Sequence, residues 1–464
     1  MIGTVEEGGG PQLLRALTSF TNLILEGKTL SITRPYFFGA SLIALEKKDG
    51  GVRPIAVGCT LRRLVAKCAG NRIMQAMAEL LRPKQLGYGI PRGAEAAVHA
   101  TRIYLHNLQP QHLILKLDFR NAFNCLHRDK MLAAVREMVP ELYPLIHSAY
   151  SSPSSLFFGE SVLQSSEGVQ QGDPLGPLLF CLTIHDMLMQ LRGEFGVFYL
   201  DDGTLGGSLE EVLRDVRMVE RVAGDMGLQL NHRKSEIICD DPATRQSMLA
   251  AFPQFCVVSQ DHATLLGSPV GNSVEGIEDA IGAKTSALAL MGDRLRLLHA
   301  HDGFCLLRNA FALPKMLYTL RTAPCFLSSQ LQKFDDLQRS LLADIANISL
   351  DANDRAWAQA VLPVWSGGLG VRSASQLAPS AFLASAAGSS ELTRQILPPR
   401  LQEAPCPFHG VALALWSSGH DNPPPPAPAS SLQRSWDSPR VTLAYKKLLE
   451  TAPDAPTRAR LLAA

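Results

Sequence analysis

The chain has 464 residues, of which 46% are hydrophobic and 19% charged, with a formal net charge of +1. This composition excludes a generally disordered protein and supplies enough apolar material for about two to four globular domains. The most apolar stretch, "LGPLLFCLTI", spans about ten residues, against the roughly 20 that a membrane span needs. No signal-peptide pattern begins the chain, so we expect an intracellular protein, nuclear or cytoplasmic, with no membrane partner.

The nine cysteines are scattered along the chain without the paired spacing of a zinc module. We therefore expect free, buried thiols in a reducing compartment. Cys406 and His409 have the spacing of half a metal site, but no matching pair accompanies them.

Basic residues are concentrated between residues 28 and 110, where thirteen lysines and arginines outnumber four acidic residues by nine. A cationic lobe on an otherwise near-neutral chain is typical of proteins that contact nucleic-acid phosphates. The alternative is a basic face that is simply solvated.

The first elements alternate between strands and helices. Residues 41–59 predict a β-hairpin, because two apolar runs flank the turn sequence "KKDGG". Residues 61–81 have helical periodicity. Residues 111–119, "QHLILKLDF", predict a short buried strand that ends at Asp118, and residues 121–139 again have helical spacing.

The middle of the chain continues this alternation. The loop "VQQGDPLG" leads into an apolar helix that begins at Pro174–Leu175. Residues 194–207 predict two strands joined by a turn at Asp201–Asp202. Residues 208–227 predict an amphipathic helix that ends at Gly227.

The last part of the chain is expected to be mainly helical. Residues 276–348 show no strand-like alternation and predict a separate helical bundle. Beyond Pro363 the composition shifts toward Ala, Ser, Pro and Gly, and residues 422–431 predict a proline-rich linker outside any packed core.

Three aspartates mark the ends of the two central strands. Asp118 ends the first strand, and Asp201 and Asp202 form the tip of the second hairpin. Carboxylates that converge at one sheet edge repel one another unless a cation lies between them. Two Mg²⁺ or Mn²⁺ ions, bound by oxygen ligands alone, would satisfy this arrangement in a phosphoryl-transfer site. The alternatives are a plain polar turn for the pair and a helix cap for Asp118.

Seven segments resemble the motifs of a known family, in chain order: "KKDGGVRPIAVG", "QLGYGIPRGAEAAVHATR", "LKLDFRNAFNCL", "VQQGDPLGPLLF", "FYLDDGTLGG", "GLQLNHRKSEII" and "TLLGSPVG". Together they resemble the fingers and palm of reverse transcriptases from non-LTR (LINE-type) retrotransposons, over roughly residues 40–275. The resemblance implies an RNA-directed DNA polymerase that adds dNTPs to a primer 3′-OH by two-metal chemistry. The alternatives are a degenerate remnant that binds nucleic acid without catalysis, and another two-metal enzyme such as a nuclease.

The resemblance also implies an α+β fold of the right-hand polymerase type, with an antiparallel palm sheet, fingers, a helical thumb and a partly helical C-terminal tail. The implied domains are an N-terminal flank (1–27), fingers and palm (28–275), thumb (276–362), a C-terminal extension (363–421), the proline-rich linker (422–431) and a tail (432–464) that ends as a truncated chain would. Its partners would be an RNA template, a DNA primer and dNTPs. The sequence indicates no oligomeric state.

By resemblance, the metal ligands are Asp118, Asp201, Asp202 and the backbone carbonyl of Phe119. Phe123 matches the bulky residue that blocks a ribose 2′-OH, although it also fits a core position. The predicted nucleotide contacts are Gln171 and Gly172 beside the incoming nucleotide, and Lys48 and Arg53 at the triphosphate. Lys48 and Arg53 could instead be ordinary solvated charges of the predicted hairpin.

The remaining predicted residues follow from the same resemblance. Lys234 matches a lysine that protonates the leaving pyrophosphate, with an ordinary surface lysine as the alternative. Arg62, Arg63 and Lys67 are predicted to contact the template backbone, or else to lie on a surface helix. Gly267 lies in the turn that matches the primer grip.

Overall fold

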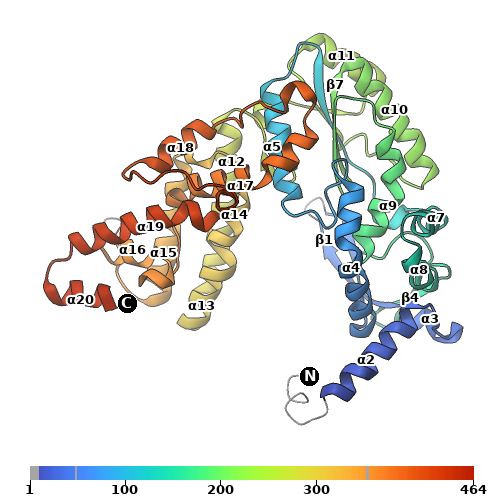
Figure 1. The fold of residues 1–464 in the computed structure, drawn as a ribbon, viewed down its shortest axis with the longest axis horizontal. Helices are drawn as coiled ribbons and strands as arrows, with labels where there is room; N and C mark the ends of the chain where they lie inside the picture. Colours follow the sequence, from blue (N-terminus) through green and yellow to red (C-terminus); the bar gives the residue numbers. More distant parts are fainter. Residues whose placement is uncertain (1–9, 48–49, 352–354, 464) are drawn as a thin grey trace. The chain divides into compact units, whose positions relative to one another are not determined.

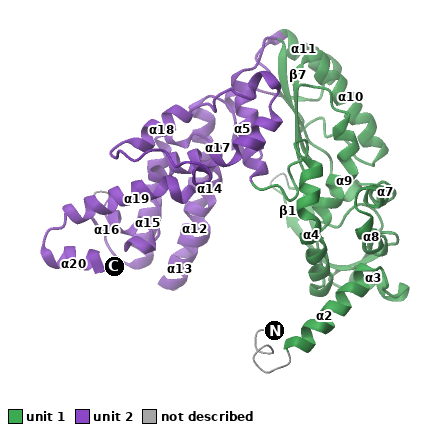
Figure 2. Ribbon diagram, viewed as in Figure 1, with its two compact units in different colours: residues 1–91, 111–237, 243–256 green, residues 92–110, 238–242, 257–464 purple. Residues whose placement is uncertain are grey.

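The computed structural model describes residues 10–47, 50–351 and 355–463. The chain forms two compact units, shown in Figure 2. Unit 1 comprises residues 1–91, 111–237 and 243–256, and unit 2 comprises residues 92–110, 238–242 and 257–464. Helices accompany sheets with mainly antiparallel pairing, which confirms the predicted α+β class.

The central sheet of unit 1 is mainly antiparallel. Its strand order is β6 (Phe195–Tyr199), β7 (Asp202–Ser208), β3 (His112–Leu117), β8 (Glu236–Ile238) and β9 (Cys256–Val258). Tyr199 pairs with Asp202 across the β6–β7 turn, and Leu117 pairs with Gly203. This register places the end of β3 beside the β6–β7 turn, so Asp118 lies next to the aspartate pair, as predicted.

Two helices of unit 1, α9 (Gly176–Met189) and α10 (Leu209–Asp225), accompany this sheet. Helix α9 buries ten of its 14 residues, as expected for a helix that is apolar on nearly all faces. Helix α10 packs against β7 (Figure 1). It begins with a capping box between Ser208 and Glu211, in which each side chain satisfies a free backbone amide of the first turn.

A second sheet of unit 1 contains the predicted hairpin. Its order is β2 (Val52–Gly58), β1 (Ala40–Glu46), β4 (Ser154–Phe158) and β5 (Ser161–Ser165). Helix α4 (Thr60–Leu81) follows the hairpin and confirms the predicted helical stretch. Two further helices, α2 (Gly10–Leu25) and α8 (Tyr143–Tyr150), were not predicted.

Unit 2 is mainly helical. Its helices include α5 (Gly93–His106), α12 (Val274–Leu295), α13 (Ala300–Leu306), α14 (Leu313–Thr322), α15 (Gln330–Ala346), α17 (Ala374–Ile396), α18 (His409–Ser417) and α19 (Gln433–Glu450). This confirms the helical character of residues 276–348. Helix α17 packs against both α5 and α14, so the predicted extension shares one compact unit with the predicted thumb. The other domain boundaries stay predictions.

The proline-rich segment is not entirely a free linker. Its last residues form a 3₁₀ turn, Ala429–Ser431, that packs against α17. The Ser431 carbonyl accepts a hydrogen bond of 2.8 Å from the Arg92 guanidinium, and the Ser430 carbonyl accepts one of 2.7 Å from the Trp436 indole. This end of the segment therefore packs on the surface of unit 2, although none of its residues is buried, and the linker stays a prediction.

Two sequence expectations need correction. All nine cysteines are free, as predicted, but Cys59, Cys68, Cys256 and Cys305 are exposed rather than buried. The basic segment is not a single cationic surface, because Arg102 is fully buried within unit 2, where burial lowers its pKa to about 10. In the part of the chain that the structure describes, no helix combines the length and apolar character of a transmembrane helix.

Candidate active site

The aspartate pair sits on a tight turn between β6 and β7. Leu200 and Asp201 are the two turn residues, and Leu200 has a φ of +56°. A positive φ is uncommon for a side chain such as leucine, and it gives the turn the twist that a two-residue hairpin requires. Asp201 therefore projects from the tip, and Asp202 begins β7.

Asp118 is held from the chain segment that precedes β8. The Asn231 side-chain amide donates a hydrogen bond of 2.9 Å to Oδ2 of Asp118, and the Asn231 backbone amide donates one of 2.7 Å to its carbonyl. The Asp118 amide in turn donates to Oγ of Ser235 at 3.3 Å. Sequence analysis missed the role of Asn231, although it lies in the motif "LNHRKSE" that carried Lys234.

The three carboxylates influence one another electrostatically. Burial first, and then repulsion by Asp201 and Asp118, raises the pKa of Asp202 from 3.8 to about 6. Burial and the Asp118 charge also raise the pKa of Asp201, while Arg53 opposes the rise. Such repulsion is what a bound dication would relieve.

The donor chemistry fits Mg²⁺ better than zinc, because the candidate ligands are oxygens. Among the described residues, no backbone amide donates to the Phe119 carbonyl, which leaves that oxygen available as a ligand. In residues 10–47, 50–351 and 355–463, no three acidic, His or Cys side chains already form a metal-binding group.

A cavity of about 450 Å³ lies beside the turn within unit 1. It is lined by Arg53, Ile55, Phe123, Gln170, Gln171, Gly172, Asp173, Gly176, Pro177 and Asp201. The structure thus brings together Asp201 and four of the residues predicted to contact the nucleotide. Its size suits a drug-sized organic ligand.

Gly172 is required by the approach of its loop to β2. The Ala56 amide donates a hydrogen bond of 2.6 Å to the Gln171 carbonyl, and Gly172 has a φ of +123°. A Cβ atom at this position would clash with the Ala56 carbonyl oxygen. In this structure, Gly172 therefore allows its loop to approach the backbone of β2, and not a nucleotide or template.

Arg62 lies inside unit 1 and supports the same loop. Its side chain is 6% exposed, and its guanidinium contacts the Asp173 carboxylate at 2.8 Å and Oε1 of Gln170 at 2.7 Å. The Tyr150 hydroxyl donates to the same carboxylate at 2.7 Å. This geometry does not support the predicted contact of Arg62 with the template backbone, because its donors are engaged in the interior.

Phe123 combines the two alternatives left open by the sequence. Its ring stacks on Phe180 of α9, with ring centroids 4.7 Å apart and an angle of 20° between the planes. It is only partly buried, and its free side lines the cavity. It is therefore a core residue and a wall of the cavity at once.

The other predicted residues lie outside the cavity lining. Arg63 and Lys67 are exposed one turn apart on α4, and Lys234 is exposed next to Asn231. Gly267 lies in unit 2, in a turn where it has a φ of +77°. Lys48 lies outside the described residues. The roles of these residues stay predictions.

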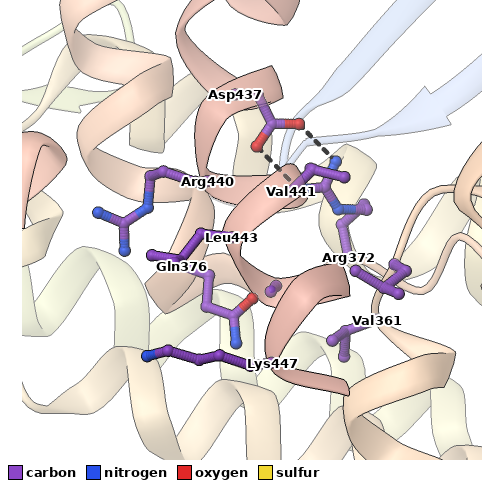
Figure 3. Close-up of a pocket in the computed structure, with 10 residues that line it drawn as sticks. Val361, Arg372, Gln376, Asp437, Arg440, Val441, Leu443 and Lys447 are labelled. Atoms are coloured by element: carbon purple, nitrogen blue, oxygen red, sulfur yellow. Dashed lines mark hydrogen bonds and ion pairs between the residues drawn. The ribbon is translucent and has the colours of Figure 1, made fainter. Parts of the chain in front are cut away.

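A second cavity, of about 210 Å³, lies in unit 2 between α17 and α19. Figure 3 shows Asp437 bound to Arg372 through two contacts, of 2.6 and 2.9 Å, with Arg440 and Lys447 on the opposite side of the cavity. Its one carboxylate is already paired with an arginine, so this cavity does not suit divalent metal ions. The candidate active site is therefore the cavity in unit 1.

Residues 45–270 match the family described as reverse transcriptase (RNA-dependent DNA polymerase). This part of the chain is a reverse transcriptase domain. The match includes all the candidate active-site residues of unit 1 and the turn at Gly267.

The chain also has similarity to individual known proteins. The retrotransposable element SLACS 132 kDa protein of Trypanosoma brucei gambiense is 27% identical over 209 residues, which cover 43% of this chain and 17% of that protein. The chain thus spans about a sixth of that relative. Among solved structures, a Candida albicans telomerase in complex with a fragment of telomeric RNA matches with a TM-score of 0.44 and 10% identity, over 83% of this chain and 65% of its own. An apo telomerase from Candida tropicalis matches with a TM-score of 0.39 and 10% identity, over 92% and 69%.

Proposed function

We propose that the chain is an RNA-directed DNA polymerase that adds dNTPs to a primer 3′-OH by two-metal phosphoryl transfer. The observation that supports this most strongly is the position of Asp118, Asp201 and Asp202 at one end of the central sheet, within the reverse transcriptase domain. The cavity that Asp201 lines supplies a place for the incoming nucleotide.

Metal binding is the proposed role of the carboxylates at the β6–β7 turn. Asp118, Asp201, Asp202 and the Phe119 carbonyl would hold two Mg²⁺ or Mn²⁺ ions. When bound, these ions lower the pKa of the primer hydroxyl and stabilise the negative charge on the leaving pyrophosphate. Asp173, the other carboxylate of the cavity lining, is paired with Arg62, which leaves Asp201 as the lining carboxylate proposed to bind metal.

The cavity walls orient the nucleotide. Arg53 supplies positive charge for the triphosphate, and Lys48, five residues earlier in the sequence, is proposed to add to it. Gln171 and Gly172 lie beside the nucleotide, and Phe123 fills the space that a ribose 2′-OH would need. Lys234 donates a proton to the leaving pyrophosphate.

The template and primer are proposed to be RNA and DNA. Arg63 and Lys67, exposed one turn apart on α4, contact the template backbone, and the Gly267 turn contacts the primer. The order of the motifs, together with the similarity to the SLACS protein, favours an element of the non-LTR type.

Incorporation of labelled dTTP on a poly(rA) template primed with oligo(dT) tests the proposal. We expect Mg²⁺-dependent incorporation by the wild type and its loss in Asp118→Asn. The alternative, a remnant that binds nucleic acid without catalysis, predicts equal binding of the primed template by both proteins and incorporation by neither. A nuclease would shorten the labelled primer without requiring dTTP.

A further inference from the structure

The turn that carries the aspartate pair is bound by a residue far away in the sequence. Gln85 is fully buried, and its side-chain amide contacts both backbone polar groups of Leu200. Oε1 of Gln85 accepts a hydrogen bond of 2.8 Å from the Leu200 amide, and Nε2 donates one of 3.0 Å to the Leu200 carbonyl. Leu200 is the turn residue with a φ of +56°.

Gln85 itself is fixed by backbone contacts to the neighbouring strand. The Phe198 amide donates to the Lys84 carbonyl at 2.8 Å, and the Leu86 amide donates to the Phe198 carbonyl at 2.8 Å. Residues 84–86 therefore run beside β6 as a short parallel extension of the sheet. Oε1 of Gln85 also accepts from the Gly87 amide at 2.9 Å, which orients the side-chain amide.

Gly87 packs directly against Leu200 of the turn. A Cβ atom at position 87 would lie 2.6 Å from both the backbone nitrogen and Cγ of Leu200. The turn and residues 84–87 are therefore packed without space for another side chain. A displacement of Gln85 would displace the backbone of Leu200.

We infer that Gln85 is a positioning residue for the metal-binding carboxylates, an inference that rests on the proposed function. Because Leu200 immediately precedes Asp201, the two hydrogen bonds that hold Leu200 at positive φ also set the direction of Asp201 and Asp202. A neutral amide is needed, since one end must accept and the other must donate. Glutamate keeps the acceptor and loses the donor, and leucine leaves both backbone groups of Leu200 without a partner.

Three variants test whether Gln85 positions the β6–β7 turn or only stabilises the fold in general. Gln85→Leu removes both hydrogen bonds, Gln85→Glu removes the donated one at nearly constant volume, and Gln75→Leu changes an exposed glutamine of α4 as the matched control. Hydrogen exchange measured by mass spectrometry on peptides spanning residues 196–204 reports on the turn. Mn²⁺ titration followed by electron paramagnetic resonance reports on the metal site without nucleotide chemistry.

We expect Gln85→Leu to speed exchange in the turn peptide by about tenfold and to weaken Mn²⁺ binding by about tenfold, because a buried backbone group that loses its partner costs roughly that factor. Exchange in α10 should change less than twofold in the same protein. Gln85→Glu loses one hydrogen bond and buries a carboxyl group, so it should speed exchange in the turn peptide at least as much as Gln85→Leu, and Gln75→Leu should match the wild type.

Each alternative outcome overturns the inference. Unchanged turn exchange and unchanged Mn²⁺ affinity in both Gln85 variants would show that Gln85 does not position the turn. Faster exchange in every peptide, α10 included, for Gln85→Glu as well as Gln85→Leu would show that its role is general stability. The inference is separable from the proposed function, because a wild-type protein that binds no Mn²⁺ and extends no primer refutes the function whatever the exchange data show.

Discussion

Neutralising one carboxylate of the aspartate pair should stabilise the metal-free protein, even though it removes a proposed metal ligand. The perturbation is Asp202→Asn, measured in the presence of a chelator. In the folded protein, burial and the charges of Asp201 and Asp118 raise the pKa of Asp202 to about 6, so its ionised form is less favourable than in the unfolded chain. Asparagine has no charge to bury.

The magnitude follows from this pKa. A rise from 3.8 to about 6 corresponds to about 3 kcal/mol for a fully buried carboxyl group. Because part of Asp202 is also open to solvent, screening reduces the expected gain in the free energy of unfolding to about 1 kcal/mol. Because the pKa is raised, the penalty is complete above about pH 6 and disappears as the pH falls toward 4.

Hydrogen exchange is the suitable assay. All four tryptophans lie in unit 2, so tryptophan fluorescence does not follow unfolding of the reverse transcriptase domain in unit 1. Exchange of the β3 and β7 amides, corrected for intrinsic rates, should slow about fivefold in Asp202→Asn at pH 7.5 and match the wild type at pH 4. Asp186→Asn, on the exposed face of α9, should change neither value. Faster exchange in Asp202→Asn at pH 7.5, or a gain that persists at pH 4, would refute this reasoning.

Three further substitutions test the cavity. Phe123→Ala removes the ring that lines it, and the preference for dTTP over UTP should fall at least tenfold in competition assays; unchanged preference would exclude a gating role. Arg62→Met leaves the Asp173 carboxylate buried without its cation, so it should lower the free energy of unfolding by about 3 kcal/mol in urea titrations. An unchanged free energy of unfolding would instead indicate that Arg62 contacts the template. Gly172→Ala clashes with β2 and should lower the melting temperature, whereas Gly224→Ala in α10, with open space around it and no positive φ, should not lower it.

Local patterns were sufficient for much of the fold. The β1–β2 hairpin and α10 form where turn and capping residues place them, since "DGG" and the Ser208–Glu211 box act within a few residues. The neighbouring positions of Asp118 and the pair at 201–202 also followed from the expected strand order.

Contacts between distant segments were not predictable from the sequence. Gln85 lies 115 residues from Leu200, and Arg62 lies 111 residues from Asp173. Neither pair has a local signature, because both side chains look like exposed polar residues until the tertiary fold buries them. The sequence alone therefore predicts a template contact for Arg62 and gives no role for Gln85. The burial of α17 was not predictable for the same reason, since α5, against which it packs, lies far away in the sequence.

The most direct test of the proposed function is single-nucleotide extension of a DNA primer on an RNA template, measured with Mg²⁺ under single-turnover conditions. We expect the wild type and Asp186→Asn to add the complementary dNTP at equal rates. Asp201→Asn should be slower by at least a thousandfold while binding the primed template equally well, since loss of a group essential to the transition state commonly costs several kcal/mol. Equal extension by Asp201→Asn and the wild type would contradict the assignment of the active site to the β6–β7 turn.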